Sequence, residues 1–187
     1  MVLMDREGWS LVFPPTELVS RIVLTIPSHL GSVGSMSAPL GADRLIGFLK
    51  DLPPFYWTIP YVGKRYPGAA NEGNLGEGAN CQRYSFSVLA FFAFTIPDFR
   101  SSDLWQDTVA TRRVSSPEPL DLLLFNRSDG PWGVHVGLYV ADNAVLHLCK
   151  EVGFPQVWKL EDFSQRPRYR YLVGIKRVRA VEERTHR

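Results

Sequence analysis

Three residues in this chain have the types and the order that thiol catalysis needs. Cys81 follows Asn80, a good N-cap residue, so we expect the cysteine in the first turn of a helix. The positive end of the helix macrodipole favours a thiolate there, and the thiolate is the nucleophile. His135 and His147 follow within one apolar stretch. One imidazole could carry the proton while a second polar group fixes its tautomer, which is the papain-type arrangement.

Both histidines fall on predicted strands that a short turn joins. Period-2 alternation in 134–140 and in 145–149 places each histidine on the face away from the main aliphatic row of its strand. A two-residue turn at Asp142–Asn143 would send His135 and His147 to opposite faces of the sheet. A common face therefore requires an odd-length loop or a β-bulge.

The surrounding elements follow from periodicity and turn residues. Residues 80–94 are apolar nearly all round at helical spacing, which predicts a buried helix. A helix is also expected over 42–52, followed by an extended, glycine-studded loop over 53–79. The predicted strands are 120–126, 134–140, 144–150, 156–160 and 169–178. One helix followed by a run of antiparallel strands indicates an α+β fold.

Composition excludes several classes of protein. The 187 residues are 45% hydrophobic and 21% charged, as in an ordinary globular domain. A formal net charge of +2 does not favour nucleic-acid binding. No apolar run approaches the ~20 residues of a membrane span. Charged residues at 5–7 interrupt the start of the chain, so no signal peptide is predicted. We expect a cytosolic protein, one exported or injected by a signal-independent route, or a chain whose signal has been removed.

With these residues in place, the chain resembles the NlpC-type cell-wall cysteine peptidases. That family has a cysteine at a helix start, a "GDL" strand, an "HVGIY" strand and a downstream "IH" on the next strand. A "PY-x-x-G"-like stretch before the cysteine carries a tyrosine that contributes near the oxyanion. The matching segments here are Asn80-Cys81, Leu120-Asp121-Leu122, His135-Val136-Gly137-Leu138-Tyr139, Leu146-His147 and Pro60-Tyr61-Val62-Gly63.

The chain also departs from the family pattern. The family usually has "DCSG" around the cysteine, where this chain has Asn80-Cys81-Gln82-Arg83. Leu120 stands where a turn glycine is normal. The gap between Tyr61 and the cysteine is longer than usual, so Tyr66 is a second candidate for the oxyanion site. These departures affect the expected substrate class more than the expected nucleophile.

The resemblance implies a papain-like fold in which the nucleophile helix packs on an antiparallel sheet of about five strands. It implies a Cys-His-His hydrolase, with Cys81 as nucleophile, His135 as base and then acid, and His147 as orienting residue. Asp142 or Asn143 remains an alternative for that last role. The Cys81 N–H would stabilise the oxyanion. No cofactor or metal is expected, because Cys/His pairs at zinc spacing are absent from the sequence.

The implied substrate is a bacterial cell-wall peptide, cleaved at a D-γ-glutamyl bond to a diamino acid. Two alternatives remain: an acyltransferase or lipid-amide hydrolase on the related fold, and a catalytically inactive wall-binding module. We expect a catalytic domain over 41–180, an extension of unclear role over 1–40 and a basic tail over 181–187. The basic run 166–187 indicates a solvated surface or a weak attraction to anionic polymers. Cys149 is expected to be structural, with a disulfide to Cys81 left open.

Overall fold

The computed structural model describes residues 49–180. The expectations for 1–40, for 181–187 and for most of the helix over 42–52 lie outside the described residues.

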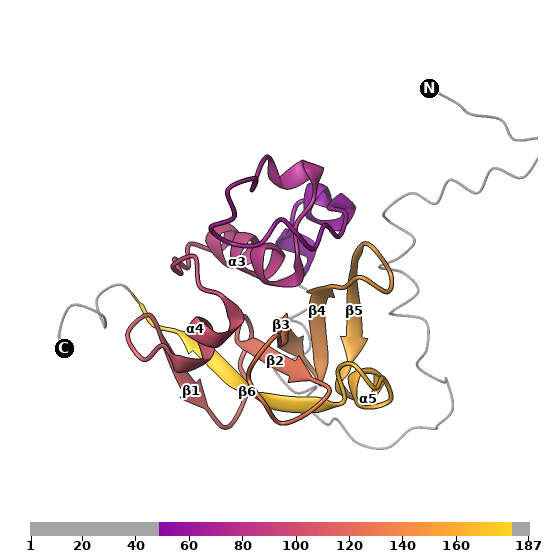
Figure 1. The fold of residues 1–187 in the computed structure, drawn as a ribbon. Coiled ribbons are helices and arrows are strands. Elements are labelled where there is room, and N and C mark those ends of the chain that lie inside the picture. Colours follow the sequence, from indigo (N-terminus) through magenta and orange to yellow (C-terminus); the bar gives the residue numbers. More distant parts are fainter. Residues whose placement is uncertain (1–48, 181–187) are drawn as a thin grey trace, which may run out of the picture. The chain divides into compact units, whose positions relative to one another are not determined.

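A six-stranded antiparallel sheet with strand order β1-β6-β2-β3-β4-β5 organises this part of the chain (Figure 1). The strands are β1 (Thr111–Val114), β2 (Leu122–Asn126), β3 (His135–Ala141), β4 (Ala144–Leu148), β5 (Pro155–Lys159) and β6 (Tyr171–Val178). The α+β class is confirmed, with one strand more than expected. The additional strand is β1, which pairs with β6. Arg112 and Arg113 are both exposed and adjacent, so β1 does not show the alternation of apolar and polar residues that predicts a strand.

Helix α3 (Cys81–Phe91) packs against β3 and β4, as the sequence predicts for the helix that begins at Cys81. The Asn80 side chain caps it by accepting a hydrogen bond from the Arg83 N–H at 2.8 Å. Its buried aliphatic and aromatic side chains include Tyr84 and Val88. The shorter helices are η1 (Pro54–Thr58), η2 (Leu75–Glu77), α4 (Ser101–Gln106) and α5 (Leu160–Ser164), which the sequence reading does not identify. None of the helices in residues 49–180 combines the length and the apolar character that a membrane-spanning helix requires.

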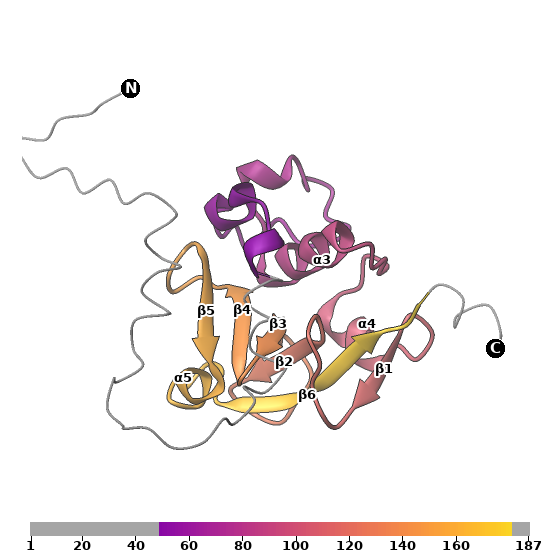
Figure 2. The same ribbon diagram turned by 180° about the vertical axis from the view of Figure 1, so that it is seen from behind.

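The two faces of the sheet bury two separate sets of side chains, as the predicted alternation requires. One face packs with α3 and contributes Leu124, Val136, Leu138, Leu146 and Leu148 to a first core. The opposite face joins α5 in a second core that contains Leu123, Phe125, Val145, Cys149, Phe163, Tyr169 and Ile175. The view from behind shows α5 beside the start of β6 and away from α3 (Figure 2).

The β3–β4 connection contains both a tight turn and a bulge. Asp142–Asn143 form a two-residue turn with φ angles of 43° and 60°, as a type I′ turn requires. A register shift within Tyr139–Ala141 adds one residue to β3. Beyond that shift His147 lies opposite Gly137, which shares a sheet face with His135. The bulge therefore places both histidines on one face despite the two-residue turn.

The turn before β2 holds Leu120 in a backbone conformation that favours glycine. Leu120 has a φ of 73°, in the left-handed region that costs about 1–2 kcal/mol for a residue with a side chain. Its side chain packs against the first core, which offsets part of that cost. The buried Asp121 carboxylate accepts a hydrogen bond from the Glu118 N–H at 2.7 Å. Asp121 also pairs with Arg177 through two bonds of 2.8 and 2.7 Å.

Candidate active site

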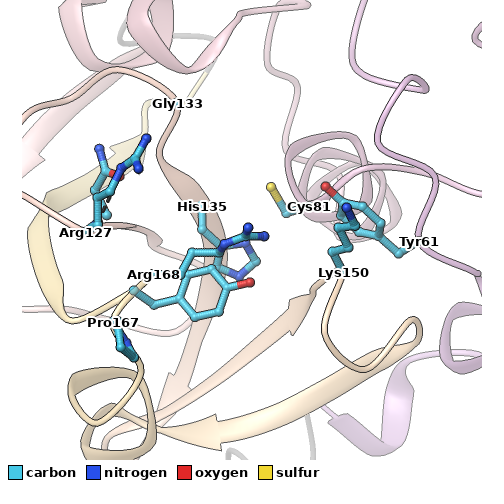
Figure 3. A pocket seen from close by; sticks show the side chains of 10 residues that line it. Tyr61, Cys81, Arg127, Gly133, His135, Lys150, Pro167 and Arg168 are labelled. Atoms are coloured by element: carbon cyan, nitrogen blue, oxygen red, sulfur yellow. Dashed lines mark hydrogen bonds between the residues drawn. The ribbon is translucent and has the colours of Figure 1, made fainter.

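A cavity of about 480 Å³ lies at the end of the sheet where β2 and β4 end and β3 and β6 begin (Figure 3). Cys81 enters it from the first turn of α3, and His135 enters it from the first residue of β3. The lining residues are Tyr61, Cys81, Asn126, Arg127, Gly133, His135, Lys150, Pro167, Arg168 and Tyr169. Cys81 begins the helix that packs on one face of the sheet, whereas the His135 side chain contacts Phe163 and Tyr169 of the core on the opposite face. Both side chains line the cavity at the end of the sheet.

The Cys81 thiol is held by backbone N–H groups from two elements. Hydrogen bonds from the backbone of Val136 and of the first helical residues, Cys81 and Gln82, lower its pKa, as the expected helix terminus should. Burial acts in the opposite direction and dominates, so the pKa of the Cys81 thiol is raised above its ordinary value. The expectation of a preformed thiolate is therefore wrong: burial favours the neutral thiol in the unliganded site.

His135 and His147 are directly bonded. The distance from His135 Nε2 to His147 Nδ1 is 3.0 Å, and both side chains are buried. Because Nε2 of His135 is engaged by His147, Nδ1 is the ring nitrogen that remains available for another partner. Asp142 and Asn143, the alternative orienting residues, lie in the turn at the opposite end of β3. Their position excludes them from contact with His135.

Burial also fixes the protonation state of the two imidazoles. It lowers the pKa of His135 to about 3, with a further contribution from the positive charge of Arg168. It lowers the pKa of His147 well below its ordinary value, with contributions from His135 and Arg166. Both rings are therefore neutral near pH 7, and the hydrogen bond between them carries a single proton.

The surroundings of His147 are aromatic. Its ring meets Trp158 edge-on at a centroid distance of 4.2 Å and approaches Phe163 at 4.8 Å. Its Nε2 is buried without a hydrogen-bond partner among the described residues. When His135 carries its proton on Nε2, His147 must accept at Nδ1 and carry its own proton on Nε2. That N–H then lies among ring faces, which offer only weak N–H···π contacts.

Tyr61 lines the cavity because its backbone pairs with Ala79, the residue that precedes the Asn80 cap of α3. Tyr61 and Ala79 form a parallel β-bridge, and the Val62 N–H donates to the Ala79 carbonyl at 2.8 Å. Burial, followed by the nearby Cys81, raises the pKa of Tyr61, so its phenol is a neutral hydrogen-bond donor. Tyr66 does not line the cavity, and the Arg100 guanidinium lies over its ring at 3.9 Å.

The two unusual residues after Cys81 hold neighbouring loops. Gln82 is buried and donates from Nε2 to the Phe99 carbonyl at 2.7 Å. Arg83 donates to three backbone carbonyls of the loop that precedes the helix, those of Glu72, Gly73 and Gly78. Gln82 thus bonds the segment that follows α3, and Arg83 bonds the loop that precedes it.

Seven of the ten cavity residues are not among the residues predicted from the sequence: Asn126, Arg127, Gly133, Lys150, Pro167, Arg168 and Tyr169. The basic run 166–187 includes Arg168, and it predicts a solvated surface or a weak attraction to anionic polymers rather than a cavity residue. Cys149 is a free, buried thiol in the second core, and Cys81 is free as well. Among residues 49–180, no group of three His, Cys, Asp or Glu side chains could hold a metal ion.

Comparison with known proteins finds solved structures of similar fold, but no match to a protein-family model or to a curated protein. The NlpC/p60 domain of the peptidoglycan hydrolase SagA matches with a TM-score of 0.46 and 16% identity, over 74% of this chain and 97% of that one. An NlpC/p60 family protein from Bacillus cereus matches with a TM-score of 0.48 and 20% identity, over 75% of this chain and 40% of that one.

Proposed function

We propose that this protein is a cysteine hydrolase of amide bonds, with Cys81 as nucleophile, His135 as general base and acid, and His147 as positioning residue. The single observation that carries the proposal is the 3.0 Å bond from His147 to Nε2 of His135, a histidine that shares a cavity with Cys81. This bond leaves Nδ1 of His135 available for the thiol proton.

The neutral forms of the Cys81 thiol and the His135 imidazole determine how the reaction begins. Because the free thiol and imidazole are both neutral, attack on the substrate carbonyl is coupled to transfer of the Cys81 proton to Nδ1 of His135. The resulting imidazolium keeps its Nε2–H bond to His147, which becomes charge-assisted and stronger. His135 then returns the proton to the leaving amine. Water completes the reaction by hydrolysing the thioester, with His135 again as base.

The oxyanion of the tetrahedral intermediate requires donors beside the nucleophile. The backbone N–H of Cys81 lies in the first turn of α3, where it contacts the Cys81 sulfur and has no carbonyl partner within the helix. The phenol of Tyr61 lines the same cavity and is neutral. We assign both as oxyanion donors, with Tyr61 preferred to Tyr66 because Tyr66 is stacked under Arg100 outside the cavity.

The proposed substrate is a bacterial cell-wall peptide, and the proposed bond joins a D-γ-glutamyl residue to a diamino acid. The motif order from Cys81 through His147 supports this class of substrate. A γ-linked glutamate keeps a free α-carboxylate beside the scissile amide. A cavity that contains three cationic side chains and no acidic one suits such a group.

The test is loss of amide cleavage in single and double variants. Cys81→Ser replaces the thiol by a far weaker nucleophile, and His135→Ala removes the base. We expect each variant to reduce the release of new amino groups from wall tetrapeptides by at least about a thousandfold. The double variant should show no further loss, because the two residues act as one unit.

Circular dichroism of both variants should show a folded protein, and Cys149→Ser serves as the matched thiol control with activity retained. Full cleavage by Cys81→Ser would remove that residue from the mechanism. A wild-type protein that binds wall peptides without cleaving them would identify a binding module instead. Release of fatty acid from lipid amides, with wall peptides left intact, would favour the lipid-directed alternative.

A further inference from the structure

The cavity that holds the proposed catalytic pair has a strongly one-sided charge. Arg127, Lys150 and Arg168 line it, and none of its lining residues is acidic. They come from the end of β2, the end of β4 and the segment before β6, three parts of the chain that meet only in the folded protein. The formal net charge of the whole chain is only +2, so the positive charge of the cavity is local and does not reflect a basic protein.

These three cations take no part in the ion pairs of the described residues. The ion pairs among residues 49–180 involve Arg65, Arg83, Arg166 and Arg177, each with a glutamate or an aspartate. No carboxylate within that part of the chain pairs with Arg127, Lys150 or Arg168. Like charges that converge without a counter-charge repel one another, and an anionic ligand would remove that repulsion.

Among the three cavity cations, Arg168 is the one whose charge acts on the proposed catalytic groups. Its charge acts on both His135 and Tyr61, the imidazole and the phenol of the site. Its side chain also hydrogen-bonds Tyr169, whose ring packs on His135 at a centroid distance of 4.7 Å. A guanidinium has five N–H donors, so the bond to Tyr169 leaves donors for a ligand.

We propose that Arg168, assisted by Lys150, binds a substrate carboxylate on the residue next to the scissile amide and thereby determines substrate specificity. The inference rests on the proposed function and adds to it the specificity-determining residue. Arg168 suits a carboxylate because its planar fork can make two parallel N–H···O bonds, whereas Lys150 adds a point charge.

Binding of this carboxylate also changes the environment of the base. The groups that face His135 are Cys81 from α3, His147 from β4, and Arg168 and Tyr169 from the segment before β6. Of these, Arg168 carries a full positive charge that opposes the imidazolium form. A bound carboxylate offsets that charge, so His135 becomes a better proton acceptor when the correct substrate is present.

The test compares two wall tetrapeptides that differ in one group. In one, the γ-linked glutamate has a free α-carboxylate, and in the other the same carboxylate is capped as a primary amide. Calorimetric titration of the full-length Cys81→Ser variant measures binding without cleavage. We expect the free carboxylate to bind about tenfold more tightly or better, and the preference to decrease at high salt because the cations are exposed.

Arg168→Gln in the same background should reduce the preference to within about twofold. The matched control is Arg112→Gln, which removes the same charge from an exposed position on β1, outside the cavity, and should keep the preference. Equal binding of the two peptides, or a preference that survives Arg168→Gln, would overturn the proposal. So would binding of inorganic phosphate or anionic lipid vesicles through Arg168 in place of either peptide.

Cleavage by the wild-type protein is measured separately with the same two peptides. A carboxylate preference in binding without any cleavage would overturn the proposed function while supporting the role of Arg168. Cleavage of both peptides at equal kcat/KM would do the reverse.

Discussion

At the residue scale, Cys81 illustrates competition between a helix terminus and burial. A helix N-terminus stabilises a negative charge by about 0.3–1 kcal/mol, which corresponds to less than one pKa unit. Burial can shift a pKa by several units in the opposite direction. The thiol in the free protein is therefore neutral, with its pKa raised above the ordinary value. In the proposed mechanism, activation comes from the coupled transfer of its proton to His135.

The role of His147 is tested by replacing its ring with an amide. In His147→Asn, Oδ1 can occupy the position of Nδ1 and accept from Nε2 of His135, and the buried Nε2 without a partner disappears. We expect kcat to stay within about tenfold of the wild-type value. His147→Leu leaves the His135 donor buried and unbonded, which costs about 1–3 kcal/mol, or roughly ten- to a hundredfold in kcat.

Steady-state kinetics separate these effects, because a positioning residue affects kcat more than KM. Thermal unfolding of both variants controls for a loss of folded protein. Equal losses of activity in the asparagine and leucine variants would show that the hydrogen bond is not what His147 contributes.

At the element scale, the β3–β4 hairpin determines whether the two histidines meet. Its two-residue turn alone would separate them to opposite faces, and the bulge at Tyr139–Ala141 reverses that outcome. Gly137 stands opposite His147 in the resulting register. A Cβ at position 137 would lie 2.6 Å from a methyl of Val145 and 3.2 Å from Cβ of His147. The glycine therefore allows β4 to bring His147 close to His135.

Gly137→Ala should force β4 away and displace His147. We expect a loss of about 1–3 kcal/mol in the free energy of unfolding, as for other overpacked interiors, together with a reduced kcat. Urea denaturation and peptide cleavage measure the two effects. Gly130→Ala is the control, because its nearest contact would be Ser128 Oγ at an ordinary 3.7 Å. Unchanged stability and activity in Gly137→Ala would contradict the close approach of the strands.

At the scale of the whole molecule, the site is placed where two packing layers meet at the end of the sheet. The layer that contains α3 supplies Cys81, and the opposite layer supplies His135, His147 and the ring of Tyr169. This arrangement buries both imidazoles in their neutral forms, at 8% exposure for His135 and 0% for His147. Burial of two titratable rings links the stability of the fold to pH.

We expect the protein to lose stability as the pH falls below about 6.5, the pKa of an unfolded histidine. The folded-state pKa of His135 is lowered to about 3, and that of His147 is also lowered, so the unfolded chain binds these protons first. The free energy of unfolding should therefore fall by up to about 1.4 kcal/mol per pH unit for each histidine. Urea denaturation at pH 7, 6 and 5 measures this slope.

His147→Asn removes one of the two titrating rings and should reduce the slope by about half of the histidine contribution. Carboxylates titrate equally in both proteins, so they cancel in the comparison. Identical slopes for the wild type and the variant would mean that His147 is not held neutral by the fold.

The sequence by itself determined the features that depend on near neighbours along the chain. Asn80 before an apolar helical run predicted the helix cap and the position of Cys81, and the structure confirms both. Alternation placed the histidines away from the aliphatic rows, which the two cores also confirm. Strand β1 was missed because its pattern is interrupted by arginines at 112–113.

Only the tertiary structure decided the features that depend on residues distant in sequence. Strand register brought His135 and His147 to one face, and pairing with Ala79 placed Tyr61 rather than Tyr66 at the cavity. Burial reversed the expected pKa shift of Cys81. One physical reason covers all three features. Periodicity and helix caps are local in sequence, whereas strand register, strand pairing and desolvation depend on which distant segments pack together.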